Sequence, residues 1–204
     1  MTMEHATILS GFGGQGLLFA GQVLAQAGVL EDRHVTWLPS YGPEMRGGTA
    51  SCTVIVADRP IGSPIVDRAD IVVALNPPSL AKYEHLLVPG GLLVINDSLV
   101  EADPTRDDVE VLRIPASKLA REVGDERVIS IVALGAALGR RPIVDPESVR
   151  RALTEGAKGG AAAVKMNLRA LALGLEQGSP VATQGTGPGA TASRRGTPRS
   201  APRA

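Results

Sequence analysis

The stretch ATILSGFGGQGLLFAGQVLAQAGVL, residues 6–30, decides the fold. A short apolar run at residues 6–9 predicts a β-strand, and apolar residues recur at helical spacing from Leu17 to Gly28. Between them lies GFGGQG, residues 11–16, which has the G-x-G-x-x-G spacing of phosphate-binding loops in the strand-to-helix context that such loops require. The stretch therefore predicts a strand, a glycine loop and a helix in direct succession.

Strand-like and helix-like segments alternate along the rest of the chain. β-branched or aliphatic runs predict strands at residues 34–38, 49–57, 69–75, 90–96 and 109–116. Periodic or apolar runs predict helices at residues 77–87, 115–124, 128–140, 145–156 and 160–178, and VPGG at residues 88–91 predicts a turn. We expect an α/β fold, a Rossmann-like three-layer domain with a mostly parallel sheet and a helical C-terminal part.

The composition changes after residue 178. Residues 179–204 are rich in Pro, Gly, Ser, Thr and Ala, carry four Arg and no acid, and show no apolar periodicity. Such a segment cannot bury enough apolar surface to offset the entropy of ordering it. We therefore expect one domain over residues 1–178 and a disordered tail over residues 179–204; a weak anionic partner for the tail is the alternative to a plain solvated tail.

Charge and cysteine content exclude several classes of function. The formal net charge is zero, which argues against a nucleic-acid or membrane-surface partner. A single cysteine, Cys52, cannot form an internal disulfide or hold an iron–sulfur cluster or a structural zinc by itself, and inside a strand it reads as a small core residue. The start of the chain lacks the pattern of a signal peptide and no apolar run reaches membrane-spanning length, so we expect a cytoplasmic protein.

The glycine loop supplies the first set of candidate cofactor-binding residues: Gly11, Gly13, Gly14, Gln15 and Gly16. We expect Gly11 to permit a tight turn, Gly13 to let a ligand approach the backbone, and Gly16 to let helix and strand pack closely. The N-terminus of the helix offers free N–H groups to a phosphate. The alternative is a glycine turn that binds no ligand.

A nicotinamide dinucleotide is disfavoured as the ligand of this loop. The Rossmann pattern places Asp or Glu at the end of the second strand, where it binds the ribose. Here that strand ends in VTWLPS, residues 35–40, with no acid and no Arg. The glycine loop could instead bind the phosphate or pyrophosphate of another ligand, or the backbone of a partner protein.

The second candidate set lies in SYGPEMRGG, residues 40–48, and at the end of the fourth expected strand. The guanidinium of Arg46 could bind a carboxylate or phosphate, or form a salt bridge with Glu44. Tyr41 could stack on a ligand or pack in an interface. Asn76 stands at the end of a strand, where α/β proteins bind ligands, or it caps the following turn.

These motifs together resemble one family. GFGGQG, YGPEMRGGTASCTVIV, DIVVALNPPSLAKY, GGLLVIND and VALGA, in this order, are similar to the gamma subunit of 2-oxoacid:ferredoxin oxidoreductases, over roughly residues 6–178. The specific part is residues 41–48, because this pattern is far rarer than a glycine loop. One departure is Ser130, at a place where the resemblance leads us to expect Asn.

The resemblance implies a complex that oxidatively decarboxylates a 2-oxoacid, transfers the acyl group to coenzyme A and reduces ferredoxin. Thiamine diphosphate, magnesium and iron–sulfur clusters are then held by partner alpha and beta, and possibly delta, subunits. The gamma subunit holds none of these alone and completes the coenzyme A side of the site. This agrees with the single cysteine and with the lack of a Gly-Asp-Gly diphosphate signature or a catalytic triad in the sequence.

We therefore expect no catalytic residue and no metal ligand in this chain. Residues 41–48 in this form favour 2-oxoglutarate as the 2-oxoacid, although pyruvate, branched-chain 2-oxoacids and indolepyruvate are served by related complexes. The alternative is a stand-alone nucleotide-binding Rossmann protein or dehydrogenase that uses the glycine loop.

Overall fold

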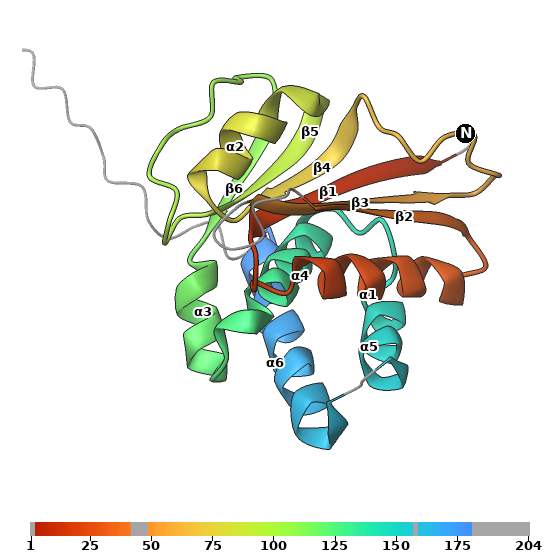
Figure 1. The fold of residues 1–204 in the computed structure, drawn as a ribbon, viewed down its shortest axis with the longest axis vertical. Helices are drawn as coiled ribbons and strands as arrows, with labels where there is room; N and C mark the ends of the chain where they lie inside the picture. The colour runs from red at the N-terminus through yellow and green to blue at the C-terminus, as the bar shows by residue number, and fades with distance from the viewer. Residues whose placement is uncertain (1–2, 42–48, 157–158, 181–204) are drawn as a thin grey trace, which may run out of the picture.

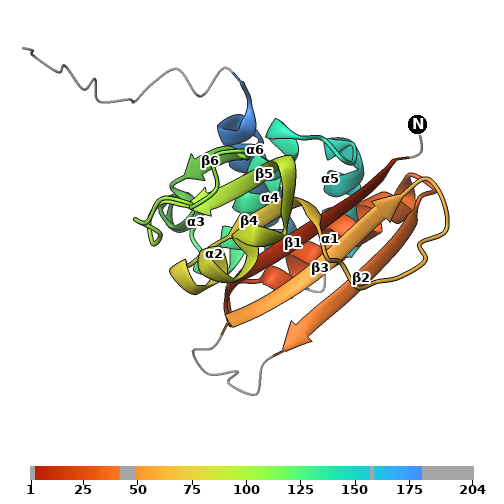
Figure 2. The same cartoon turned by 90° about the horizontal axis from the view of Figure 1, so that it is seen from above.

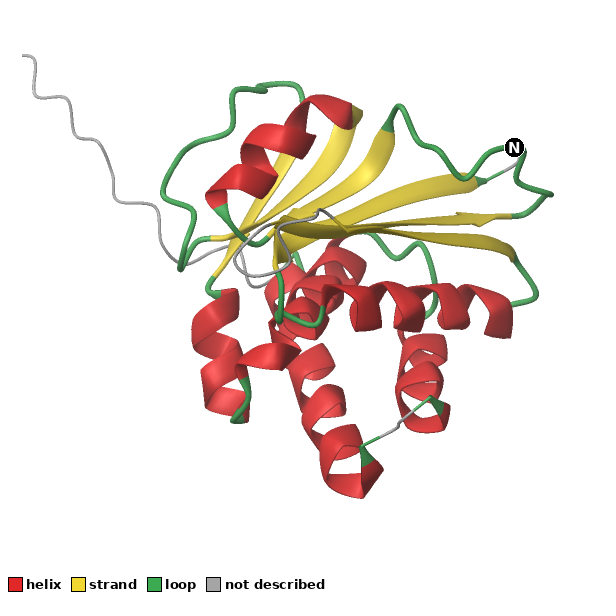
Figure 3. Ribbon diagram, viewed as in Figure 1, coloured by secondary structure: helices red, strands yellow, loops and turns green. Residues whose placement is uncertain are grey.

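The computed structural model describes residues 3–41, 49–156 and 159–180, which form a six-stranded sheet with helices on both faces (Figures 1 and 3). The strands are β1 (Glu4–Phe12), β2 (His34–Tyr41), β3 (Thr49–Ala57), β4 (Ala69–Ala74), β5 (Leu87–Asn96) and β6 (Glu110–Ile114). The helices are α1 (Leu17–Leu30), α2 (Pro77–Tyr83), α3 (Ala116–Val123), α4 (Ile129–Arg140), α5 (Pro146–Glu155) and α6 (Gly160–Gly178), with short 3-10 turns η1 (Glu84–Leu86) and η2 (Glu126–Val128).

The strand order is β2-β3-β1-β4-β5-β6, and only β3 runs against the others (Figure 2). The expected mostly parallel sheet is therefore confirmed. Strands β2 and β3 form a hairpin, and β3 separates β2 from β1. The ends of this hairpin consequently lie beside the end of β1, where Gly11 pairs with Ala50 and Phe12 with Thr49.

The two faces of the sheet are covered unequally. Helices α1, α3, α4, α5 and α6 lie on one face, and α2 lies on the other (Figure 1). The larger core lies between the sheet and the thick helical layer. It contains the aliphatic strand residues that face this layer, such as Leu9, Val54 and Val94. The smaller core lies under α2 and includes Ile8, Val72 and Leu93. The expected aliphatic core is confirmed, because both clusters of buried residues lack aromatic side chains.

Helices α4 and α6 pack backbone against backbone. A Cβ atom on Gly135 would lie 2.6 Å from the carbonyl oxygen of Leu171, and one on Gly139 would lie 2.5 Å from that of Leu175. Gly174 and Gly178 of α6 make the reciprocal approach to carbonyl oxygens of α4. Glycine is needed at these positions because any side chain would force the two helices apart.

The expected elements occur in the expected order, but several of their bounds differ from the structure. Strand β1 extends past its expected end through Gly11 and Phe12, and β2 extends past Leu38 to Tyr41, because β3 supplies hydrogen-bonding partners there. Strand β6 ends at Ile114, two residues before its expected end. The expected turn at residues 88–91 is wrong: these residues belong to β5, with Gly90 at a positive φ of 73° next to a register irregularity. The expected helix at 77–87 ends as α2 at Tyr83. The expected disordered tail lies outside the described residues from residue 181 onward.

Candidate functional site

The candidate site lies where β1, β2 and β4 end and β3 begins. The glycine loop leaves β1 here, the β2–β3 hairpin turns here, and Asn76 follows β4. The rungs between β1 and β3 place both ends of residues 42–48 next to the glycine loop, since Tyr41 pairs with Ala50 and Ala50 with Gly11. The two sequence motifs are therefore neighbours in the fold.

The turn of the glycine loop is made by Gly14 and Gly16. Their φ angles are 92° and 76°, a region that side chains with a Cβ atom rarely adopt. The expected turn at Gly11 is wrong, because this residue is still part of β1. Its missing Cβ instead leaves room for Oε1 of Gln15, which accepts a hydrogen bond of 2.7 Å from the backbone N–H of Phe12.

Gly16 lets α1 approach the start of α4. A Cβ atom at Gly16 would collide with the carbonyl oxygen of Arg127 and would lie 2.9 Å from Oγ of Ser130. We expected Gly16 to let a helix pack closely against a strand. That expectation is wrong about the neighbouring element, because Gly16 lies against the η2–α4 segment and not against a strand. Ser130 is buried, and within the described chain its hydroxyl has no hydrogen-bond partner.

A cavity of about 410 Å³ opens beside the glycine loop. The first turns of three helices border it, since Gln15 precedes α1, Ser117 is in the first turn of α3 and Ile129 begins α4. No side chain caps the N-terminus of α1, which leaves N–H donors and the positive end of the helix dipole available to an anion. At the start of α4, the N–H of Ile129 already donates to the carbonyl oxygen of Glu126. The lining residues are Gly13, Gly14, Gln15, Ser98, Leu99, Ser117, Ala120, Arg121, Glu126, Arg127 and Ile129.

Two arginines at the cavity are in different states. Arg127 donates from Nη2 to Oδ2 of Asp125 over 2.6 Å and from Nε over 2.9 Å, although its side chain is 80% exposed. The Arg127 guanidinium lowers the pKa of the Asp125 carboxyl, mainly by hydrogen bonding. Arg121, on α3, is exposed and forms no hydrogen bond or ion pair in the part of the chain that the structure describes. Glu126 adds one negative charge to the rim.

A buried amide holds α3 at this edge of the sheet. Asn96, the last residue of β5, donates from Nδ2 to the carbonyl oxygen of Leu75 and to Oγ of Ser117, and its Oδ1 accepts from the N–H of Ser117. The sequence interpretation missed Asn96, Arg121 and Arg127. Asn96 could have been found by the same signal that singled out Asn76, a polar residue at the end of a buried strand.

Asn76 itself is the N-cap of α2. Its Oδ1 accepts a hydrogen bond of 2.8 Å from the N–H of Ser79, as the capping alternative predicted. The side chain is fully buried, and its Nδ2 has no partner among the described residues. Capping therefore accounts for this residue without a ligand, and a cofactor contact at Asn76 stays a prediction.

The loop candidates fall largely outside the described structure. Glu44 and Arg46 lie in residues 42–48, outside the described residues, and for Tyr41 only the backbone pairing with Ala50 is described. Cys52, in contrast, is buried in the sheet beneath α1, which confirms the expected core role. Burial raises the pKa of its thiol to about 12.

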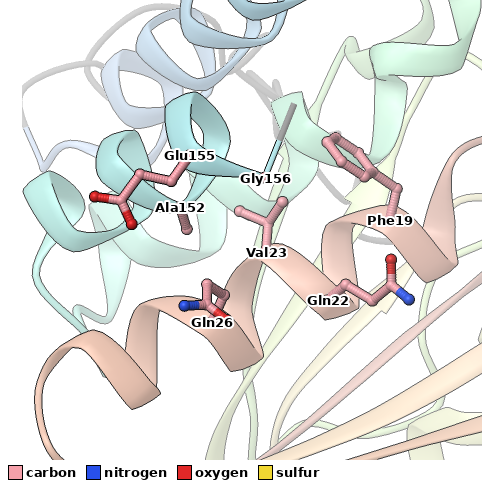
Figure 4. Close-up of a pocket in the computed structure, with 7 residues that line it drawn as sticks. All are labelled: Phe19, Gln22, Val23, Gln26, Ala152, Glu155 and Gly156. Carbon is pink, nitrogen blue, oxygen red and sulfur yellow. The ribbon is translucent and has the colours of Figure 1, made fainter. Parts of the chain in front are cut away.

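A second cavity, of about 330 Å³, lies between α1 and α5 (Figure 4). Phe19, Val23 and Ala152 give it apolar walls, and the amides of Gln22 and Gln26 lie along α1 at its rim. Among the described residues that line it, Glu155 is the ionisable one, and its carboxylate lies 3.6 Å from Nη2 of Arg151. These described residues offer no cationic group for a phosphate.

Among the described residues, no group of three or more His, Cys, Asp or Glu side chains is arranged to hold a metal ion. No helix among them combines the length and hydropathy that crossing a bilayer requires.

Comparison with known proteins identifies the family. The family model for pyruvate ferredoxin/flavodoxin oxidoreductase matches residues 6–177. The ketoisovalerate oxidoreductase subunit VorA of Methanothermobacter thermautotrophicus is 41% identical over 82% of this chain, and the 2-oxoglutarate synthase subunit KorC of Methanocaldococcus jannaschii is 36% identical over 85% of it. The chain covers 94% of KorC but only 35% of VorA, so it spans about a third of the ketoisovalerate subunit that it matches.

Solved structures give the same result. A keto/oxoacid ferredoxin oxidoreductase gamma subunit from Geobacter sulfurreducens PCA superposes with a TM-score of 0.77 at 31% identity, over 86% of this chain and 97% of that one. The 2-oxoglutarate:ferredoxin oxidoreductase from Magnetococcus marinus, whose structure contains 2-oxoglutarate, coenzyme A and succinyl-CoA, shares the fold with a TM-score of 0.76 at 23% identity, over 86% of this chain and 31% of that one. The chain therefore belongs to the pyruvate ferredoxin/flavodoxin oxidoreductase family and corresponds to the gamma-subunit domain of its oxoacid members.

Proposed function

We propose that the chain is the gamma subunit of a 2-oxoacid:ferredoxin oxidoreductase and that its glycine-loop cavity receives coenzyme A. The complex would decarboxylate a 2-oxoacid oxidatively, form the acyl-CoA and reduce ferredoxin. One observation carries the coenzyme A assignment: the glycine loop before the uncapped start of α1 lines the same cavity as Arg121 of α3 and Arg127 of η2.

The donor set at this cavity fits coenzyme A. A diphosphate is bound well by free N–H groups at a helix start that follows a glycine loop. Gly13 and Gly14 have no side chain, and a Cβ at Gly14 would meet nothing within 4 Å, so backbone is accessible there. Leu99 and Ile129 add apolar wall, which suits the uncharged pantetheine arm.

The redox chemistry requires partners in this proposal. The described residues include one cysteine and no cluster of metal-ligating side chains, so they do not fit an iron–sulfur cluster or a magnesium diphosphate site. We assign thiamine diphosphate, magnesium and the iron–sulfur clusters to alpha and beta subunits, and also to a delta subunit where the complex has one.

In this proposal, residues 1–178 are the functional domain, and Tyr41, Glu44 and Arg46 contact the cofactor or a partner subunit. A free buried thiol suits the reducing cytoplasm, where we place the complex.

The substrate we propose is 2-oxoglutarate. The support is that relatives matched along nearly their whole length, such as KorC of Methanocaldococcus jannaschii, are 2-oxoglutarate synthase subunits. The ketoisovalerate subunits share higher identity but are about three times as long as the region that they share with this chain, so a branched-chain 2-oxoacid is the competing assignment.

The experiment is purification of the native complex through a tag on this chain, followed by reduction of a viologen dye. We expect reduction that requires both coenzyme A and a 2-oxoacid, with 2-oxoglutarate giving a higher kcat/KM than pyruvate or 3-methyl-2-oxobutanoate. Thiamine diphosphate and iron should co-purify. A complex without them would contradict the function, and preference for 3-methyl-2-oxobutanoate would contradict only the substrate.

A preparation of the isolated chain tests the stand-alone alternative. Calorimetric titration of the purified chain with NAD⁺ and NADP⁺ should show no binding, because the end of β2 carries no ribose-binding acid. Tight binding of either dinucleotide to the isolated chain would favour a dehydrogenase instead.

A further inference from the structure

The residues that line the glycine-loop cavity supply two chemically different kinds of group. Gly13, Gly14 and Gln15 supply backbone N–H donors. The segments α3 and η2 supply cationic side chains, those of Arg121 and Arg127. Ser117 and Arg121 lie four residues apart on α3 and so share the helix face that borders the cavity.

Of the two arginines, Arg121 is the one with an uncommitted charge. The guanidinium of Arg127 is engaged by both carboxylate oxygens of Asp125. Arg121 has no such partner in the described part of the chain, and the acidic residue among those described as lining the cavity is Glu126. An unpaired arginine at a cavity is suited to a phosphate monoester, because its planar fork can donate two hydrogen bonds to one phosphate.

We infer that Arg121 binds the 3′-phosphate of coenzyme A and makes the site selective for coenzyme A over 3′-dephospho-coenzyme A. The inference rests on the proposed function. Coenzyme A carries a diphosphate and, separately on its ribose, a phosphate monoester. The glycine loop and the start of α1 take the diphosphate, and Arg121 takes the monoester. Glu126 opposes this charge and sets an upper limit on the affinity.

The test is calorimetric binding of coenzyme A and of 3′-dephospho-coenzyme A to the purified complex, with steady-state KM values for both. We expect Arg121→Gln to raise the Kd and KM for coenzyme A by about 10- to 100-fold, as loss of a charge-assisted hydrogen-bond pair does. The values for 3′-dephospho-coenzyme A should change less than about twofold. Arg121 is exposed and without a described partner, so the variant should keep the stability of the parent.

Two further variants complete the experiment. Lys118→Gln removes a positive charge from the same helix, but Lys118 does not line the cavity, so both ligands should bind as in the parent. Glu126→Gln removes the opposing carboxylate and should strengthen binding of coenzyme A more than of its dephospho form. An equal loss of both ligands in Arg121→Gln would overturn the inference and assign Arg121 to the diphosphate. No loss in Arg121→Gln would also overturn it.

The outcomes separate this inference from the proposed function. If turnover of the native complex requires coenzyme A but Arg121→Gln binds both ligands as the parent does, only the inference fails. If the complex turns over 2-oxoacids without coenzyme A, the proposed function fails first.

Discussion

Helix α1 borders two cavities of comparable size, about 410 Å³ at its first turn and about 330 Å³ along its flank. The helix itself, LLFAGQVLAQAGVL, carries no charged residue. At its start, Gly16 leaves the first N–H groups uncapped, and arginines of other elements stand near them. Along its flank, the backbone is fully hydrogen-bonded within the helix and only Phe19, Val23 and two glutamines face the cavity.

The difference shows where anion binding originates on a helix. A helix offers unpaired donors only at its N-terminus, so an uncharged helix can still contribute to an anion site at that end. Its flank can contribute only what its side chains carry, and here these are apolar or amide groups. Size alone therefore does not distinguish the two cavities, whereas the position of the helix end does.

The largest expected effect comes from a side chain at Gly16, which would separate the glycine loop from η2 and α4. Gly16→Ala places a Cβ against the carbonyl oxygen of Arg127 and forces a left-handed backbone on alanine. We expect a loss of about 2–4 kcal/mol in the free energy of unfolding and a fall of at least about 100-fold in kcat/KM for coenzyme A. Urea unfolding and steady-state kinetics measure the two effects.

Gly14→Ala is the matched control for Gly16→Ala. Gly14 has a similar positive φ of 92°, but a Cβ there would meet nothing within 4 Å. It should cost only about 1 kcal/mol of backbone strain. If the two variants were equally damaging, contact with η2 and α4 would not be what makes Gly16 necessary.

A smaller effect should come from the glutamines at the two cavities. Gln15→Ala removes the acceptor for the N–H of Phe12 and loosens the loop, so we expect KM for coenzyme A to rise about 5- to 10-fold with kcat unchanged. Gln22→Ala makes the same change at the flank cavity and should leave both constants as they are. Equal effects of the two substitutions would remove the functional distinction between the cavities.

The effect that is smallest at neutral pH concerns Cys52, which lies beneath α1 and whose thiol donates to the carbonyl oxygen of Leu17. Burial raises its pKa from an ordinary 9.0 to about 12, so the folded chain keeps this proton at a pH at which the unfolded chain releases it. Stability should therefore be unaffected below pH 9 and should fall above it, by roughly 1.4 kcal/mol for each pH unit up to about pH 12.

Urea unfolding at pH 8 and pH 10 measures this fall in the free energy of unfolding. In Cys52→Ala, the part of the fall that the Cys52 thiol causes should be absent. Iodoacetamide should label Cys52 only as fast as α1 opens from the sheet. Rapid labelling of the folded chain at pH 8 would show that α1 does not hold the two cavities as one rigid unit.

Local patterns in the sequence predict much of this fold. Residues 49–57 and 160–178 were predicted to the residue, because residue type and period change abruptly at their ends. The extension of β1 through Gly11 could not be predicted, because it depends on β3, which is distant in the sequence and runs antiparallel. The placement of the turn at residues 88–91 failed because Pro and Gly also occur at strand irregularities.

Only the part of the candidate site that is continuous in the sequence was predictable. The glycine loop is a continuous motif and was found. Arg121 and Arg127 belong to segments more than one hundred residues away and carry no motif of their own, so only the packing of α3 and η2 brings them to the loop. Asn96 acts through a contact with Ser117, which is 21 residues away in the sequence.

The hairpin rung between Tyr41 and Ala50 has an engineering consequence. Tyr41 and Thr49, the residues on either side of 42–48, both belong to the sheet, because Tyr41 pairs with Ala50 and Thr49 pairs with Phe12 of β1. We therefore expect that the residues between Tyr41 and Thr49 can be replaced by those of a ketoisovalerate or 2-oxoglutarate relative without changing the register of these strands.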